Sequence, residues 1–167
     1  IPLPTPQLSG YAEGHRERNT NLIFVGTRQA INPGFIFKPI AQPAQFLTYR
    51  KAKNLFIDQL SRPALDHIRY RPYKRSTSDL EEASYILKHH GAIKFLESDL
   101  NSELLKCRLA YIDNPGTTLH FALAANVPTV CYWDKKSWPL CKQAVAFFDE
   151  LEKVGILHGA PESAALH

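Results

Sequence analysis

The feature that most constrains the fold of this chain is the regular alternation of short, continuously apolar runs with segments of helical periodicity. Strands that are apolar on both sides must be covered on both sides, and strands joined through helices form parallel sheets. The sequence therefore predicts an α/β fold: a doubly wound parallel sheet of about five strands with helices on both faces. The predicted strands are residues 21–26, 66–73, 92–97, 108–113 and 128–133.

The segments between these runs predict helices. Residues 44–60 place Tyr49, Ala52, Phe56 and Leu60 on one face. Four more helices are expected: one capped by Ser78 and ending before Gly91, a short one capped by Asp99 or Asn101, one between the threonines at 117 and 118 and Asn126, and a long one from about Pro139 to Gly155. In the last of these, helical spacing turns one set of side chains inward: Leu140, Ala144, Phe147, Phe148 and Leu151.

The N-terminal segment has a different character. Residues 1–20 are proline-rich and then polar, with no helical or strand periodicity, and are expected to form a linker or an extended arm. Residues 21–167 are expected to form one domain. The sequence contains no methionine, so we expect it to be a piece of a longer protein.

Basic residues gather in the first part of the chain, where ligands of such folds bind. Residues 1–75 carry a net charge of +8 and the remainder −4, within a total of +4. In parallel sheets the ligand lies beyond the carboxyl ends of the strands. Several of the residues at these ends are polar or basic, as in the groups Gly26-Thr27-Arg28, Arg69 with Arg71, and Asp113-Asn114. This placement favours an anionic ligand over a merely solvated basic face.

The stretch NPGTT at residues 114–118 is the most specific of these strand ends. Gly116 permits a tight turn, and Thr117 or Thr118 can cap the helix that follows. Free N–H groups and the positive end of the helix dipole would bind phosphate there. The alternative is a well-capped turn without a ligand.

Other classes of protein lose support because their signatures are missing. The chain has no GxGxxG, GxxxxGK[ST], GxSxG or HExxH pattern, no apolar run of transmembrane length and no nucleic-acid-binding motif. No metal site is predicted, and the three cysteines are expected to be reduced core residues. Trp133 and Trp138 either pack in the core or stack on a base.

The C-terminal third resembles a known family. Residues 109–134, LAYIDNPGTTLHFALAANVPTVCYWD, and the following SWPLCKQAVAFFDELEKVGILHGAPESAA are similar to the C-terminal end of transferases encoded in bacterial surface-carbohydrate and O-antigen gene clusters. Those proteins resemble GT-B glycosyltransferases, whose C-terminal Rossmann-like domain binds a nucleotide-activated sugar. One departure is that Phe121 to Pro128 reads FALAANVP, where many GT-B relatives have the pattern E-A-L-A-x-G-x-P, whose glutamate commonly holds the ribose hydroxyls. His120 is either its substitute or a surface or packing residue.

The resemblance implies roles for particular residues. The loop facing the donor phosphates would be formed by Asp113, Asn114, Gly116, Thr117 and Thr118, and the opposite wall by Gly26, Thr27 and Arg28. Arg69 and Arg71 would be the catalytic pair that neutralises the leaving phosphate.

The function expected from the resemblance is that of the donor-binding domain of a nucleotide-sugar-dependent glycosyltransferase in surface polysaccharide biosynthesis. It would use a nucleotide-sugar as substrate and no further cofactor, with a glycan or lipid-linked acceptor and a missing N-terminal domain as partners. We expect it in the cytoplasm, free or peripheral at the inner membrane. The alternatives are a non-catalytic nucleotide- or anion-binding module, and a polyol-phosphate transferase or epimerase of the same architecture.

Overall fold

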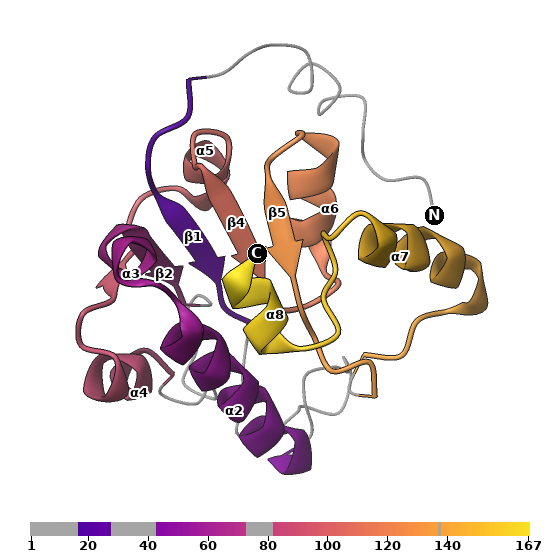
Figure 1. Cartoon of the computed structure of the whole chain (residues 1–167), viewed down its shortest axis with the longest axis horizontal. Coiled ribbons are helices and arrows are strands. Elements are labelled where there is room, and N and C mark those ends of the chain that lie inside the picture. The colour runs from indigo at the N-terminus through magenta and orange to yellow at the C-terminus, as the bar shows by residue number, and fades with distance from the viewer. Residues whose placement is uncertain (1–16, 28–42, 73–81, 137) are drawn as a thin grey trace.

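The computed structural model describes residues 17–27, 43–72, 82–136 and 138–167, which are built around a parallel sheet (Figure 1). Each pair of neighbouring strands runs parallel, so the predicted α/β fold is confirmed. In the order in which they lie in the sheet, its five strands are β3 (Lys94–Phe95), β2 (Ile68–Arg71), β1 (Leu22–Val25), β4 (Leu109–Ile112) and β5 (Thr129–Cys131).

The strand order contains one reversal. The chain runs outward from β1 through β2 to β3, then crosses back to β4 and continues outward to β5. Phe24 of β1 pairs with Tyr70 on one side and with Tyr111 on the other. The connections from β1 and β4 therefore leave in opposite directions, which opens a crevice between the carboxyl ends of these two strands.

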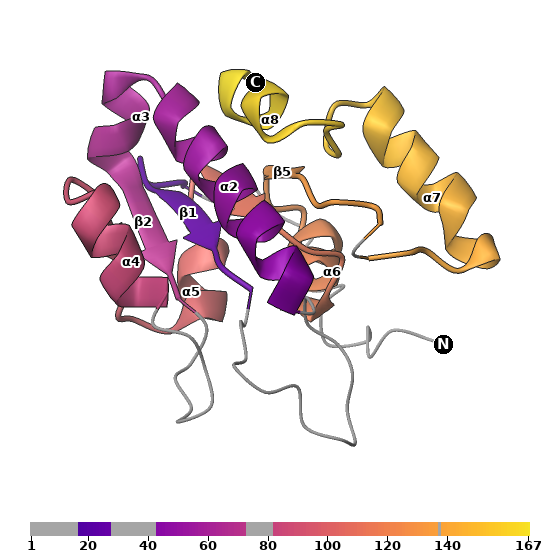
Figure 2. The same cartoon turned by 90° about the horizontal axis from the view of Figure 1, so that it is seen from below.

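Helices cover both faces of the sheet. The cluster of buried residues on one face includes side chains of α2, α4 and α8, and the cluster on the other face includes those of α5, α6 and α7. In both views α2 lies between α4 and α8 (Figures 1 and 2). The helices of the described residues are α2 (Pro43–Gln59), α3 (Arg62–His67), α4 (Glu82–His89), α5 (Leu100–Leu104), α6 (Thr117–Ala124), α7 (Lys142–Lys153) and α8 (Pro161–Leu166).

The core beneath α2 is aromatic. The ring of Phe56 stacks on Tyr111 with centroids 3.5 Å apart, and Phe24 meets both rings edge-on. The edge-to-face contacts of Phe24 are a favoured geometry of aromatic pairs. Phe56 was predicted to face inward from α2, and this is confirmed, since it is 4% exposed.

Two predicted boundaries were wrong. The segment predicted as a strand from residue 66 begins as helix α3, and β2 starts only at Ile68. The Ser61 side chain accepts a hydrogen bond from the Ala64 N–H and Pro63 follows in the first turn, a combination that starts a helix. The last long helix, α7, begins at Lys142 and not near Pro139.

Several residues at helix boundaries were predicted correctly, at starts as well as at ends. Asp99 caps α5 by accepting a hydrogen bond from the Ser102 N–H, and Asn126 has a φ of 51°, the left-handed conformation that ends α6. Gly155, with a φ of 75°, follows α7. The predicted cap Ser78 lies outside the described residues.

All three cysteines have free thiols. Cys107 and Cys131 are buried, as predicted. Cys141 is exposed, which corrects its prediction as a core residue: it stands directly before the first turn of α7, where the chain returns to the surface.

Residues 17–20 lead into β1 and contact the loops at the amino end of the sheet. The Arg18 guanidinium donates to the carbonyls of Cys107 and Asn126 at 3.2 and 2.9 Å. Among the described residues, no helix combines the length and apolar character needed to cross a membrane.

Candidate functional site

The crevice between β1 and β4 is bridged by side chains from both strand ends. Thr27 follows β1, and Asp113 and Asn114 follow β4. The Thr27 hydroxyl donates to an oxygen of the Asp113 carboxylate at 2.6 Å, and the Asn114 amide donates to the Thr27 hydroxyl. The sequence placed these three residues at one site, and the structure brings them together.

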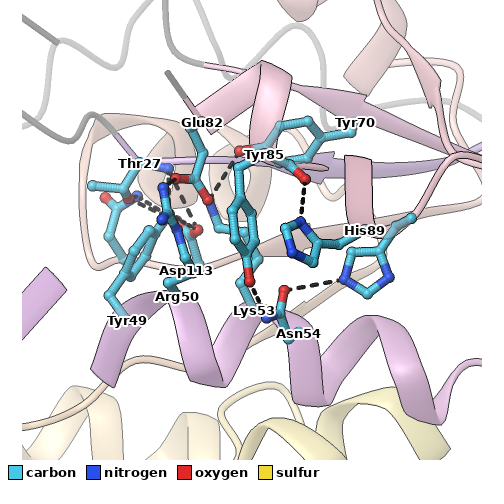
Figure 3. Close-up of polar contacts among 12 residues, drawn as sticks. Thr27, Tyr49, Arg50, Lys53, Asn54, Tyr70, Glu82, Tyr85, His89 and Asp113 are labelled. Carbon is cyan, nitrogen blue, oxygen red and sulfur yellow. Dashed lines mark hydrogen bonds and ion pairs between the residues drawn. The ribbon is translucent and has the colours of Figure 1, made fainter. Parts of the chain in front are cut away.

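The Asp113 carboxylate faces inward. It is 5% exposed and accepts hydrogen bonds from the Tyr49 hydroxyl of α2 as well as from Thr27 (Figure 3). The Thr27 N–H donates to the Tyr49 oxygen at 2.9 Å. Asp113 therefore joins β1, β4 and α2.

Close packing favours glycine at position 116. Its φ of −92° is ordinary, but a Cβ there would lie 2.3 Å from the Asn114 side-chain oxygen. The nitrogen of the same Asn114 amide donates a hydrogen bond to the Thr27 hydroxyl. The Asn114 side chain therefore links the turn at Gly116 to the end of β1. The prediction of a tight turn without a Cβ at Gly116 is confirmed in this sense.

The start of α6 is open at the carboxyl edge of the sheet. Its N-cap is Gly116, so the prediction that Thr117 or Thr118 caps the helix was wrong: they are the first two residues of the helix itself. No side chain caps α6, whereas the Gly116 carbonyl accepts from the N–H groups of Leu119 and His120. The N–H groups at the start of a helix without a cap can bind an anion.

The guanidinium groups of the two arginines of β2 lie at opposite ends of the strand. The Arg71 guanidinium donates to the carbonyls of Leu96 and Ser98, both at 3.0 Å, and so reaches the carboxyl edge beside β3. The Arg69 guanidinium donates instead to the carbonyls of Ile68 and Asp66, at the amino end of its strand. Gly26 packs against the Tyr70 hydroxyl, and Arg28 lies outside the described residues.

A cluster of charges is buried on the α2 side of this edge. Lys53 is 2% exposed, and its Nζ donates to the Tyr70 hydroxyl at 2.9 Å. It also forms an ion pair with Glu82 of α4 at 3.1 Å, and Arg50 pairs with the other Glu82 oxygen at the same distance (Figure 3). Two cations of α2 thus hold one buried carboxylate of α4.

These surroundings set the protonation states. Burial opposes the charge of Lys53, but the facing oxygens of Tyr70, Glu82 and Asp113 outweigh it and raise its pKa above the ordinary value. Burial and the Asp113 charge raise the pKa of Tyr49, and burial raises that of Tyr70. Lys53 is therefore charged and both phenols are neutral at physiological pH.

A cleft opens beside this cluster, between α2 and the segment that follows β5. Its free volume is about 20 Å³, enough for about one water molecule. Half of its ten lining residues are aromatic, namely Tyr49, Tyr111, Tyr132, Trp133 and Trp138, and the charged residues Lys53, Asp113 and Asp134 also line it. No group of three His, Cys, Asp or Glu side chains among the described residues is arranged to hold a metal ion.

A model of one protein family matches the whole length of this sequence. The family is described as the LIC12162 family transferases, and its model covers residues 1–167. The chain belongs to this family. No curated protein and no solved structure matches the chain.

Membership of the LIC12162 family assigns the chain to the transferases, which confirms the coarser part of the predicted function. The affiliation of this transferase with O-antigen gene clusters and with GT-B glycosyltransferases stays a prediction.

Sequence reasoning missed the α2 and α4 side chains of this candidate site. Tyr49 was predicted to face inward, but not to hold Asp113. Lys53 is four residues after Tyr49 and three before Phe56, so helical periodicity alone places it on the same inward face. Its partner Glu82 comes from another helix, and only the fold could identify that pair.

Proposed function

We propose that this transferase uses a nucleotide-activated sugar as donor and binds its phosphates at the start of α6. The observation that carries the proposal is the uncapped helix start at Gly116, which lies beside the crevice between β1 and β4. Ligands of doubly wound folds bind at this reversal of strand order. The hydroxyls of Thr117 and Thr118 add donors without adding charge.

The positive charge at the same edge supports an anionic donor. Arg71 ends β2, which is separated from β4 only by β1, a distance on the order of 10 Å. Its guanidinium is held by carbonyls of the β3 end, so it is oriented before any ligand arrives. Asp113 is not itself a donor contact in this proposal, because its carboxylate oxygens accept hydrogen bonds from Thr27 and Tyr49.

The chemistry of transfer needs stabilisation of the charge that develops on the leaving phosphate. Preoriented N–H groups and a fixed guanidinium supply this without reorganising during the reaction. In this proposal Arg69 adds to the positive field of β2 from the other end of the strand.

The remaining parts of the proposal concern the whole protein. The acceptor is a glycan or a lipid-linked sugar of bacterial surface polysaccharide, and an N-terminal domain of the same protein brings it to the donor. The reaction takes place in the cytoplasm or at the inner face of the membrane.

Calorimetric titration of the chain with nucleoside mono- and diphosphates and nucleotide-sugars tests the donor site. We expect one nucleotide series to bind, and Thr117→Val and Arg71→Ala to weaken it by about tenfold or more, as loss of a hydrogen bond to a charged group does. Arg69→Ala is the matched comparison because it removes the same charge from the same strand, and we expect a smaller loss. A folded wild-type chain that binds none of the panel would contradict the proposal.

A further inference from the structure

Lys53 lies beneath the crevice and takes no part in the proposed chemistry. A buried charge is costly unless it is fully paired. Lys53 has three close partners: it donates a hydrogen bond to the Tyr70 hydroxyl at 2.9 Å, forms an ion pair with the Glu82 carboxylate at 3.1 Å, and its Nζ lies 4.4 Å from the centroid of the Tyr49 ring. The last is a cation–π contact. Two of these three partners are tyrosines at the candidate site.

Both tyrosines contact the same turn. The Tyr70 hydroxyl packs against Gly26 so closely that a Cβ there would lie 2.3 Å from it. The Tyr49 hydroxyl accepts a hydrogen bond from the Thr27 N–H and donates one to Asp113. The turn at Gly26 and Thr27 is therefore held by two phenols, and Lys53 contacts both of them (Figure 3).

We propose that Lys53 is a positioning residue: by holding Tyr49 and Tyr70 it fixes the Gly26-Thr27 turn and, through Asp113 and Asn114, the start of α6. The link to α6 rests on the Asn114 side chain, which bonds Thr27 and packs against Gly116. The ligand that benefits is the one of the proposed function, so this part of the inference rests on that proposal. The effect of Lys53 on the turn at Gly26 and Thr27 is independent of the proposed function.

Amide hydrogen exchange of two adjacent residues tests the effect on the turn. The Thr27 N–H donates to the Tyr49 oxygen at 2.9 Å and, at 3.4 Å, to the Asp113 carboxylate that Tyr49 also holds, whereas the Gly26 N–H donates to the Arg71 carbonyl and so depends on the strand pairing. In Lys53→Met we expect exchange of the Thr27 amide to become about tenfold faster or more, with the Gly26 amide changing less than about twofold. A general loss of stability would accelerate both amides alike and would overturn the proposal.

Two further variants separate positioning from folding. Lys53→Met removes one of the two cations that pair with the buried Glu82 carboxylate, which itself destabilises the fold. Lys53→Met/Glu82→Gln removes both charges of this ion pair and leaves Arg50 without its carboxylate, so we expect a urea midpoint no higher than that of Lys53→Met and no restored protection of the Thr27 amide. Ile57→Val, a buried change in the same helix, is the control for stability alone. Restored protection in the double variant would overturn the proposal.

Titration with UDP and with inorganic pyrophosphate tests the link to the donor site. We expect both Lys53 variants to lower the affinity by about tenfold and Ile57→Val to leave it unchanged. Unchanged affinity despite a loosened Thr27 would overturn the positioning role. If the wild-type chain binds neither probe, the proposed donor site fails, while the exchange result still decides whether Lys53 holds the turn.

Discussion

At the scale of single residues, the polar side chains that follow β1 and β4 at the candidate site bond mainly to one another and do not point at a ligand. Asp113 and Asn114 follow a buried strand, which in the sequence makes them candidates for contact with a ligand. In the structure Asp113 is bonded to Thr27 and Tyr49, and Asn114 to Thr27 and the Asp113 carboxylate. The groups left for a ligand are main-chain N–H groups and hydroxyls at the start of α6.

Gly116→Ala tests this arrangement by adding a single carbon atom, the Cβ. The new Cβ would lie 2.3 Å from the Asn114 oxygen, so Asn114 must turn away and lose its bond to Thr27. We expect a cost of about 1–2 kcal/mol in the free energy of unfolding and about tenfold weaker binding of the donor. Urea unfolding and calorimetry measure the two effects.

Gly159→Ala is the control for Gly116→Ala, because a Cβ added at Gly159 would meet no atom within 4 Å. We expect it to change the free energy of unfolding by less than about 0.5 kcal/mol. Equal effects of the two substitutions would show that the Asn114 contact has no special role.

The residues of the site were predictable only in part, and the reason is physical. Residues directly after strands must lie at the carboxyl edge once the sheet is parallel, so Thr27, Asp113 and Gly116 could be placed from the sequence. The direction of a side chain depends on partners from other elements. Asp113 turns inward because Tyr49 of α2 meets it, and a single sequence does not reveal that contact.

At the scale of elements, local signals decided where helices end more reliably than where they begin. Asn126 was predicted from the tolerance of asparagine for left-handed backbone, and its φ of 51° agrees. The start of α3 was missed although Ser61 and Pro63 are present, because the apolar run from Ile68 was extended too far toward the N-terminus. The start of α6 was misplaced because a threonine was expected to cap it, and Gly116 stands there instead.

Substitution of Asn126 tests the end of α6. Asn126→Ala places a residue with a poorer tolerance of positive φ at 51°, and we expect it to cost about 1 kcal/mol of stability. Asn126→Gly should stay within about 0.5 kcal/mol of the wild type, because glycine adopts this conformation without strain. Chemical unfolding of both variants measures the difference, and an equal loss in both would contradict the backbone explanation.

The packing of α7 distinguishes two neighbouring phenylalanines. Both were predicted to face inward, but Phe148 is 5% exposed whereas Phe147 is 47% exposed. Phe148 meets the Trp133 ring edge-on, with centroids 5.3 Å apart, and so anchors α7 beside β5. The prediction was wrong for Phe147, because consecutive residues of a helix point about 100° apart.

Phe148→Ala is expected to cost about 3 kcal/mol, since it leaves a cavity against Trp133. Phe147→Ala removes the same atoms from the surface and is expected to cost less than about 1 kcal/mol. Urea unfolding monitored by tryptophan fluorescence measures both. A similar loss for the two variants would mean that α7 packs on the sheet through a different face.

At the scale of the whole molecule, the environment shifts the pKa values of some groups that titrate below neutral pH and of others that titrate above it. Burial lowers the pKa of His90 and of His158; the neighbouring His89 and His167 also lower them, and Asp58 partly opposes the shift of His90. Burial raises the pKa values of Tyr49, Tyr70 and Tyr111. The pKa of Lys53 is also raised, by its facing oxygens.

These shifts predict a stability profile that falls at both ends of the pH range. Below about pH 6.5 the unfolded histidines bind protons that His90 and His158 bind less readily in the fold, so stability decreases as the pH falls. Above about pH 10 the unfolded tyrosines and lysine lose protons that the folded chain retains, so stability decreases as the pH rises. The urea midpoint should therefore be highest between about pH 6.5 and 10. His90→Gln and His158→Gln should each flatten the acid limb, and Tyr49→Phe the alkaline limb. A midpoint that stays constant from pH 7 to pH 5 would show that the two histidines are as easily protonated in the fold as in the unfolded chain.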